Sequence, residues 1–481
     1  MNEDTYPKEE LLRSLPEEWP HDPMPEIQER IRKSGRKVVV VDDDPTGMQT
    51  VHGVPILTEW STEALCSELQ DEFPAFFILT NSRSCSLGEA RALNEAVGRN
   101  LLEAGRRTGR DFVTVSRSDS TLRGHFPGEC EALEGSLCRE HDGLLIIPFF
   151  LEGGRFTVED VHYVDTKGVL IPAGLTESAR DSVFGYRSSN LREWVEEKTG
   201  GKVTSGQVRS ITIDDIRRGG PQRVCRKLME LEKGAPCVIN AASYRDMEVF
   251  VLGLLEAEEK GKRFLYRTAA SFVRVRAGIH AKPLLTPSEL RLPGPGGGLV
   301  VVGSHVPRST EQLHALLRLD RIFAQELDVE VALDPQRLTA EIGRLAQAVD
   351  SALGRAQDVV VYTSRELRTA KDCEGTLAIG KSVSRALVKL LKNLSSTPRY
   401  LIAKGGITAC DLATAAMGVK RAMVLGQALP GVPVWRLGQE NRFPGMPYIV
   451  FPGNVGGPDA VADIVRMLRK KEDDRAETLR R

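Results

Sequence analysis

Residues 37–50, KVVVVDDDPTGMQT, decide the fold class of this chain. Four consecutive valines predict a strand that is buried on both faces, as in a parallel sheet covered by helices. The strand ends in Asp42, Asp43 and Asp44, which puts three carboxylates at the sheet edge where open α/β proteins bind ligands. Adjacent carboxylates repel one another, so we expect a metal ion, a substrate hydroxyl or a proton beside them. The alternative is a solvated acidic turn, because proline and glycine follow.

The same pattern, an apolar run that ends in polar residues, recurs through the first part of the chain. The further strands that it predicts are residues 75–79, 111–115, 143–147, 208–213, 237–240 and 263–266, and a short apolar segment lies at 53–57. Helical patterns lie between them, and Ser86 with Glu89 forms a capping-box signature before a helix over 86–100. This alternation predicts a doubly wound parallel sheet.

A second α/β alternation follows the proline- and glycine-rich stretch 286–298, TPSELRLPGPGGG, which we interpret as a linker. The strands expected beyond it are residues 299–302, 358–362, 400–403 and 448–451. We therefore predict two doubly wound three-layer α/β domains, 37–285 and 299–481, with a cleft for substrate and nucleotide between them. Residues 1–36 are polar and are interpreted as an N-terminal arm.

The composition is that of an ordinary soluble globular protein, with 41% hydrophobic and 27% charged residues. A net charge of -1 argues against general binding of nucleic acid or of membrane surfaces. No apolar stretch reaches transmembrane length and no secretory h-region is present, so a cytoplasmic location is predicted. The eight cysteines show no zinc-binding spacing. The oligomeric state is left open, with a homodimer as one alternative.

Acids and arginines gather at the predicted strand ends of the first domain: Asp43, Asp44, Arg83, Asp119 and Arg123. Carboxylates bind or activate hydroxyl groups, and arginines bind a carboxylate or a phosphate through two parallel hydrogen bonds. The set therefore suits a small, hydroxylated, anionic substrate. Arg117 is instead interpreted as a partner in a surface ion pair.

The second domain has two glycine-rich turns after predicted strands, GGIT at 405–408 and GNVGG at 453–457. Glycines in such turns let backbone N–H groups approach phosphate oxygens. Neither turn has the spacing of a Walker A loop or of GxGxxG. Two such turns in one domain, beside Gly303 and Ser304, predict a nucleotide site.

Three functions are weighed. One is a phosphatase of the haloacid-dehalogenase type, whose first motif DxDxT is matched by Asp42, Asp44 and Thr46, but which leaves everything after residue 299 without a role. Another is a two-domain kinase. The third is a catalytically silent protein that binds a nucleotide or a sugar acid.

The motifs taken together resemble the four-carbon acid sugar kinase family. The segments that carry the resemblance, in chain order, are residues 43–47 (DDPTG), 80–83 (TNSR), 119–124 (DSTLRG), 154–158 (GRFTV), 162–164 (HYV), 303–304 (GS), 405–408 (GGIT), 430–433 (PGVP) and 453–456 (GNVG). DSTLRG is the most distinctive of them.

The resemblance implies an ATP-dependent kinase that phosphorylates a terminal hydroxyl of a tetronate or 3-oxo-tetronate. The sugar acid would bind the first domain and Mg·ATP the second. The predicted catalytic residues are Asp44, Asp43 and Asp119, and the predicted substrate-binding residues are Thr46, Arg83, Ser120 and Arg123. The predicted nucleotide-binding residues are Ser304, Gly405, Gly406, Ile407, Thr408, Gly453, Asn454 and Gly456. Ligands for Mg²⁺ are left unassigned.

The chain also departs from the pattern of that family. The usual GGETSG loop reads GGITAC at 405–410, and Phe451 and Pro452 replace the lysine and serine of a KSGNFG loop. GSCS has become GSHV at 303–306, and Thr50 stands at a further aspartate position. These differences indicate a divergent subgroup.

Overall fold

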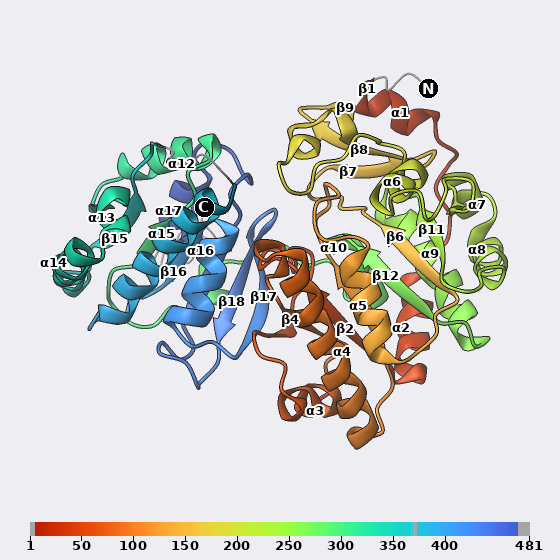
Figure 1. Ribbon diagram of the computed structural model, residues 1–481, viewed down its shortest axis with the longest axis horizontal. Helices are drawn as coiled ribbons and strands as arrows, with labels where there is room; N and C mark the ends of the chain where they lie inside the picture. Colours follow the sequence, from red (N-terminus) through yellow and green to blue (C-terminus); the bar gives the residue numbers. More distant parts are fainter. Residues whose placement is uncertain (1–4, 367, 369–372, 470–481) are drawn as a thin grey trace, which may run out of the picture. The chain divides into compact units, whose positions relative to one another are not determined.

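The computed structural model describes residues 5–366, 368 and 373–469 (Figure 1). The chain divides into an N-terminal unit, Met1–Ala281, and a C-terminal unit, Lys282–Arg481. Each unit is built around a sheet with helices packed on it, which confirms the predicted fold class.

All strands in the main sheet of the N-terminal unit are parallel. In the order in which they lie, they are β10 (Arg209–Ile211), β11 (Ala235–Ile239), β6 (Gly143–Ile147), β12 (Phe264–Thr268), β5 (Phe112–Arg117), β2 (Lys37–Asp42), β4 (Ala75–Leu79) and β3 (Val54–Leu57). The strand expected at 208–213 is shorter than predicted, because Thr212 caps the helix α7 (Ile213–Arg217) through a capping box with Asp215.

The valine strand β2 is buried on both faces, as its sequence predicts. Val39 and Val41 belong to a core with α3 (Thr62–Gln70), α4 (Leu87–Thr108) and α5 (Gly128–Leu137). Val38 and Val40 are equally buried and point to the other face. There α10 (Ala270–Arg276) contacts β2 and packs on α9 (Tyr244–Glu259), which also contacts α2 (Met24–Ser34) and α8 (Gly220–Met229). The three layers are those of a doubly wound domain.

The chain reverses its direction of travel across the sheet at β2 and β5. From β2 it proceeds to β3 and β4 on one side, and it then crosses to β5 on the other side of β2. Ligands of open α/β sheets bind outside the carboxyl ends of the strands at such a switch point. The predicted capping box of α4 is confirmed: Ser86 accepts from the Glu89 backbone, and Glu89 accepts from the Ser86 backbone.

A small antiparallel sheet, drawn in yellow in Figure 1, was not predicted. It contains β7 (Arg155–Val158), β8 (Val161–Thr166) and β9 (Val169–Pro172). Its outer strand is β1 (Tyr6–Pro7), which pairs with β9. Residues 5–36 are thus packed on the N-terminal unit through β1 and α2, with α1 (Lys8–Ser14) between them. The α6 helix (Leu191–Lys198) follows the small sheet in the chain.

The C-terminal unit has a mixed sheet. In the order in which they lie, its strands are β17 (Arg421–Leu429), β18 (Val432–Leu437), β19 (Pro447–Phe451), β16 (Leu401–Lys404), β13 (Leu299–Val302), β15 (Asp358–Thr363) and β14 (Ile322–Leu327). β17, β18 and β19 are antiparallel neighbours, and the pairs from β19 to β14 are parallel. The sequence did not predict β14 or the β17–β18 hairpin.

Helices cover both faces of this sheet as well. Val300 and Val302 share a core with α12 (Pro307–Leu317) and α17 (Ala460–Arg469). The other helices are α13 (Val329–Leu333), α14 (Pro335–Gly354), α15 (Cys373–Asn393) and α16 (Gly406–Asp411). The stretch interpreted as a linker contains α11 (Pro287–Leu290), and Leu290 is buried in the core of this unit. No helix among the described residues is long and apolar enough to cross a bilayer.

Candidate functional site

Asp42, the last residue of β2, is fully buried. Its Oδ1 accepts a hydrogen bond from Arg117 Nη1 at 3.1 Å, and Arg117 is itself 4% exposed. Its Oδ2 has no hydrogen-bond partner among the described residues, and a Cβ placed on Gly47 would lie 1.7 Å from that oxygen. Burial raises the pKa of Asp42 to about 7, against the lowering effect of Arg117. Arg117 is therefore in an ion pair, as interpreted, but the pair is buried.

Asp43 is held by Arg83 from the neighbouring strand end. Arg83, in the short 3₁₀ turn Ser82–Ser84 after β4, donates from Nε to Oδ2 at 3.1 Å and from Nη2 to Oδ1 at 2.5 Å. The Ser118 hydroxyl also donates to Asp43. The Asp43 side chain is 3% exposed. Arg83 thus binds Asp43 through two parallel hydrogen bonds, and each side chain fixes the orientation of the other.

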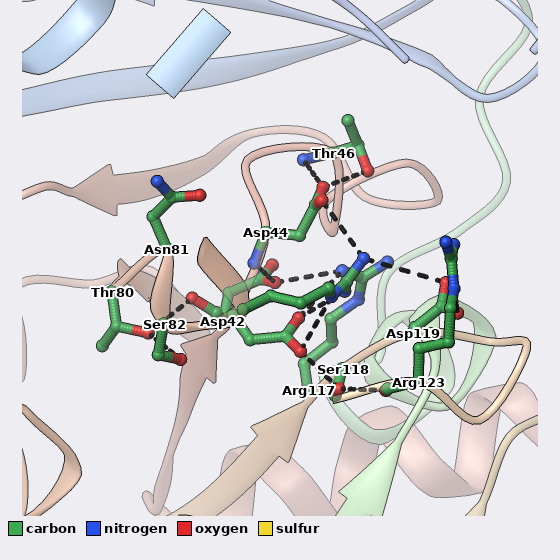
Figure 2. A network of polar contacts seen from close by, with 12 residues as sticks. Asp42, Asp44, Thr46, Thr80, Asn81, Ser82, Arg117, Ser118, Asp119 and Arg123 are labelled. Atoms are coloured by element: carbon green, nitrogen blue, oxygen red, sulfur yellow. Dashed lines mark hydrogen bonds and ion pairs between the residues drawn. The ribbon is translucent and has the colours of Figure 1, made fainter. Parts of the chain in front are cut away.

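Asp44 is the most accessible of the three acids, with a 19% exposed side chain. One oxygen accepts from the backbone and the hydroxyl of Thr46, and the other accepts from Arg83 Nη1 at 3.2 Å. Burial opposes ionisation, but the Arg83 and Arg117 charges and the Thr46 hydrogen bonds outweigh it and lower the pKa of Asp44. Asp44 is therefore an ionised carboxylate with an open side, at the start of a turn (Figure 2).

The DSTLRG loop begins two residues after β5 and contributes Asp119 and Arg123. Arg123 Nε donates to Asp119 Oδ2 at 2.8 Å, and the Thr121 hydroxyl donates to the same oxygen. Arg83 Nη1 lies 3.8 Å from the other oxygen. Burial opposes ionisation of Asp119, but the Arg123 and Arg83 charges lower its pKa well below the usual range. Figure 2 shows how this loop joins the network around β2.

Residues that the sequence analysis did not select hold the backbone of this loop. The His162 ring, fully buried on β8, bonds the Ser120 carbonyl at 2.8 Å through Nε2. The Tyr186 hydroxyl donates to the Thr121 carbonyl at 2.8 Å, and Arg267 Nη2 donates to the Arg123 carbonyl at 3.0 Å. Burial lowers the pKa of His162 to about 4, so the ring is neutral near pH 7. Ser120 is thus placed at the loop mainly through its backbone.

The predicted first-domain residues therefore meet in one network at the switch point. Carboxylates in such a network can accept hydrogen bonds from hydroxyl groups, and arginines can bind anionic groups. Among the described residues no group of three or more His, Cys, Asp or Glu has an arrangement that could hold a metal ion. Because Arg83 is occupied by Asp43 and Asp44, Arg123 is the predicted arginine with the more open guanidinium, at 30% exposure.

In the C-terminal unit, the ends of β13, β16 and β19 bring Ser304, Thr408, Gly405 and Gly453 close together. A Cβ placed on Gly405 would lie 3.0 Å from the Ser304 Cβ, and one on Gly453 would lie 3.3 Å from the Ser304 hydroxyl. One placed on Gly303 would lie 2.2 Å from the Thr408 hydroxyl. β13 and β16 are neighbours on either side of the point where this sheet reverses its strand order. Both glycine-rich turns thus lie at the switch point, where ligands bind.

The remaining predicted nucleotide residues lie around this centre but differ in exposure. Gly406 is the first residue of α16, and Ile407 is 56% exposed. Asn454 is exposed, and Gly456 lies against Ala460 at the start of α17. Ile407 is one of several large apolar side chains that are exposed singly on the described surface, so its exposure needs no special explanation.

Two residues that the sequence analysis did not select hold the turn after β19. Ser309 on α12 donates to the Gly453 carbonyl at 3.1 Å. Lys404, at the end of β16, is fully buried and donates to the carbonyls of Pro452 at 2.5 Å and Gly453 at 3.0 Å. Its ammonium lies 4.2 Å from the centre of the Phe451 ring. Lys404 thereby joins the ends of the two strands that carry the glycine-rich turns.

Arg365 is a further cation that was not selected, although it follows a predicted strand. Its Nη2 donates to the Ser304 carbonyl at 2.7 Å and to the Thr310 hydroxyl at 2.8 Å. Its Nη1 is buried and has no hydrogen-bond partner among the described residues. Burial lowers the pKa of Arg365. A charged residue directly after an apolar strand is the signal that could have indicated both Arg365 and Lys404.

We expect Lys404→Met to show a pH-dependent loss of stability. Burial lowers the pKa of Lys404 to about 7 from 10.5. Between these values the unfolded chain binds more protons than the folded chain, so this group makes stability rise with pH. The wild-type free energy of unfolding, relative to that of Lys404→Met, should therefore increase from pH 7 to 10.5. Urea unfolding at several pH values measures it, and a difference that does not change with pH would contradict the assignment.

Comparison with known protein families identifies the class that this fold and these two sites define. Residues 38–276 match a family model described as a sugar-binding N-terminal domain, and residues 299–461 match one described as a nucleotide-binding C-terminal domain. The two models together cover most of the chain. The chain belongs to the four-carbon acid sugar kinase family, as its motifs predicted.

Individual relatives are distant. The chain is 24% identical over 458 residues to a D-erythronate kinase from Heliobacterium modesticaldum, covering 90% of this chain and 97% of that protein. Among solved structures, a proposed tRNA synthase from Salmonella typhimurium LT2 is similar with a TM-score of 0.65 and 16% identity, over 90% of this chain and 99% of that one. A protein from Haemophilus influenzae is similar with a TM-score of 0.60 and 18% identity, over 89% and 100%. These two structures support the fold.

Proposed function

We propose that the protein is an ATP-dependent kinase that phosphorylates a terminal hydroxyl of a four-carbon sugar acid, a tetronate or 3-oxo-tetronate. The observation that supports the proposal is the network at the switch point of a sugar-binding domain, where Asp44 keeps an open side and Arg123 is partly exposed. The distant similarity to a D-erythronate kinase favours the same substrate class.

In this proposal the ionised Asp44 orients the hydroxyl that attacks the γ-phosphoryl group and accepts its proton. Phosphoryl transfer asks a protein mainly for positioning and for stabilisation of charge. Thr46 fixes the Asp44 carboxylate, while Asp43 and Arg83 hold each other and the base of the turn. Asp119 fixes Arg123, whose guanidinium binds the substrate carboxylate. Arg83 then positions acids and does not itself clamp the substrate.

Mg·ATP is the second substrate in this proposal. Gly303 and Gly405 have no room for a Cβ, and Gly453 has little, so backbone N–H groups can come close to a phosphate at these turns. Mg²⁺ is usually held by phosphate oxygens, water and one or two carboxylates, so a dedicated cluster of protein ligands is not required. Arg365 would add positive charge beside Ser304.

An assay of ADP release tests the proposal directly. The protein is mixed with Mg·ATP and a panel of acids: D-erythronate, L-erythronate, D-threonate, L-threonate and their 3-oxo forms. We expect at least one acid to give ADP and a phosphorylated acid in equal amounts, with the phosphate on the terminal hydroxyl by ³¹P NMR. The proposal would be overturned if no acid in the panel gave ADP and the protein instead hydrolysed an aryl phosphate in a metal-dependent reaction.

The phosphatase alternative requires Asp42 as an accessible nucleophile, and the position of Asp42 does not allow this. Asp42 would attack the phosphate in that reaction, but it is fully buried, is paired with Arg117 and has Gly47 against its second oxygen. Asp214 and Asp215, which could imitate a later phosphatase motif, lie in α7, and Asp215 is engaged in its capping box. The alternative of a catalytically silent binding protein predicts acid and ATP binding without ADP release, so the same assay separates it from the kinase.

We expect Arg123→Lys to weaken binding of the sugar acid much more than binding of ATP. Lysine keeps the charge but loses the planar fork that reaches both Asp119 and a ligand. The Michaelis constants of the two substrates measure this. The matched control is Arg218→Lys, at an arginine that follows α7 and forms an exposed ion pair with Asp214. Equal increases in both constants for Arg123→Lys would contradict the assignment of Arg123 to the sugar acid.

Two further expectations accompany the proposal. A small-molecule kinase of this kind fits a cytoplasmic location, where ATP is available, and neither nucleic acid nor a membrane is needed as a partner. A homodimer remains a prediction that light scattering of the purified protein can test.

A further inference from the structure

A second arginine, Arg155, lies near enough to Asp119 and Arg123 for their charges to act on it, and the function proposed above does not use it. It is the first residue of β7 in the small antiparallel sheet. Among the described residues its guanidinium makes no hydrogen bond or ion pair, although its Nε atom is out of contact with solvent. Arg155 is half-buried, so its charge is partly desolvated without a partner from the protein, and its N–H donors are left for a ligand.

The strand pairing directs Arg155 toward the substrate network. Arg155 and Thr157 lie on the same face of β7, because side chains alternate along a strand. Thr157 pairs across the sheet with His162, and their side chains are 3.0 Å apart. His162 in turn bonds the Ser120 carbonyl of the DSTLRG loop. The face of β7 that carries Arg155 is thus the face that holds this loop.

The acids near Arg155 are already engaged by other groups. Asp119 accepts from Arg123 and Thr121 through one oxygen and faces Arg83 through the other. Asp165, beside the strand partner of Arg155, is bonded to Lys8 at 2.8 Å and to the Gly168 backbone. Burial lowers the pKa of Arg155, the direction expected when no acid fully compensates.

Arg123 leaves part of its guanidinium open on the same side. Its Nε is used by Asp119, while its Nη1 has an ion-pair partner, Asp181, at 3.8 Å. Two guanidinium groups with open N–H donors, both within range of the Asp119 charge, suit an anion with a planar pair of oxygens. Asp44 and Thr46 lie on a different side of the network (Figure 2). Arg155 and Arg123 would thus bind the carboxylate of a small molecule, while Asp44 would bind its reacting hydroxyl.

We propose that Arg155 and the open edge of Arg123 together bind the carboxylate of the sugar acid, and that Arg155 decides the selectivity for acids over neutral polyols. This inference rests on the proposed function. It also assigns a role to the small antiparallel sheet, which delivers Arg155. Substrate binding at this subsite would direct the far hydroxyl of a four-carbon chain toward Asp44.

Calorimetric titration of wild type and Arg155→Met with D-erythronate, L-threonate and the neutral polyols erythritol and threitol tests the inference. Charge-assisted hydrogen bonds of this kind correspond to roughly 10- to 100-fold in affinity. We expect Arg155→Met to bind the acids weaker by that factor and the polyols as wild type does. Arg155→Lys should recover part of the loss. The matched control is Arg187→Met, since Arg187 is 92% exposed in the same unit.

The outcomes separate this inference from the proposed function. If wild type binds none of the acids and releases no ADP with the panel, the proposed function and the inference both fail. If wild type binds an acid and Arg155→Met binds it equally well, the assignment of Arg155 alone fails. Equal weakening for acids and polyols would show a general structural role and would also overturn the assignment, and thermal unfolding of each variant would reveal such a loss of structure.

Discussion

Asp44→Asn should lower kcat for ADP release by roughly 10²- to 10⁴-fold, the range that positioned acid–base groups contribute. Asparagine keeps the size of the side chain and can still accept from Thr46, but it cannot take the proton of the attacking hydroxyl. Because Asp44 is 19% exposed and its neighbours remain, the fold should tolerate the change. The Kd for the sugar acid should change much less than kcat.

The matched control for this variant is Asp214→Asn, at an exposed acid with 47% exposure in the same unit. Its kcat should equal that of wild type. If Asp44→Asn also keeps its full kcat, the base role passes to Asp119. If Asp44→Asn loses acid binding and kcat together, the carboxylate serves to bind the substrate, and it does not act in the chemical step.

Gly405→Ala should abolish turnover with ATP or raise the Michaelis constant for ATP strongly, while binding of the sugar acid is preserved. Gly405 has φ of +117°, a conformation that side chains rarely adopt, and its Cβ would lie 3.0 Å from that of Ser304. Holding a residue in such a region costs on the order of 1–3 kcal/mol. The turn therefore has to shift, and the backbone that would face the phosphates shifts with it.

A glycine elsewhere in the same unit separates this effect from simple strain. Gly418 has φ of +67°, and nothing lies within 4 Å of a Cβ placed there. Gly418→Ala should lose stability but keep its ATP kinetics. If the two variants lose similar stability and both keep wild-type ATP kinetics, the turn at Gly405 is not part of the nucleotide site, and the turn at Gly453 is the remaining candidate.

Local sequence was sufficient to predict the strands that are buried on both faces. The valine run of β2 and the aromatic and aliphatic run of β4 are apolar on both sides, because each strand is surrounded by other strands and by helices. The capping box at Ser86 is equally local. For the same reason the sequence alone places the acids after β2 at a ligand-binding edge.

The missed elements are those whose pattern is interrupted. β17 alternates buried and half-buried residues, but small residues such as Gly426 occupy buried positions while Met423 and Leu425 are half-buried, and the pairing has two register shifts, so its hydrophobicity does not follow its burial. β14 has only Leu327 fully buried and lies at the edge of its sheet. In the small sheet, β7 and β8 are joined by a turn in which Glu159 and Asp160 both have positive φ. None of these gives a continuous apolar signal.

The partners within the site were the least predictable part. Arg83 and Asp43 are 40 residues apart, and Arg267 and the Arg123 carbonyl are 144 residues apart. The rule that parallel strands end at one edge brings such residues to the same region, but it does not say which side chain pairs with which. Arg83 was predicted to hold the substrate, and the sequence did not indicate that its guanidinium pairs with Asp43 and Asp44.

The position of β12 determines when the main sheet of the N-terminal unit can be completed during synthesis. It is the last strand of that sheet to leave the ribosome, yet it lies between β5 and β6, which are made more than a hundred residues earlier. Its end holds the DSTLRG loop: the Thr268 carbonyl accepts from the Ser118 backbone at 2.9 Å, and Arg267 bonds the Arg123 carbonyl. A nascent chain that stops before β12 therefore lacks a strand in the middle of its sheet, and the DSTLRG loop lacks the hydrogen bonds that the end of β12 provides.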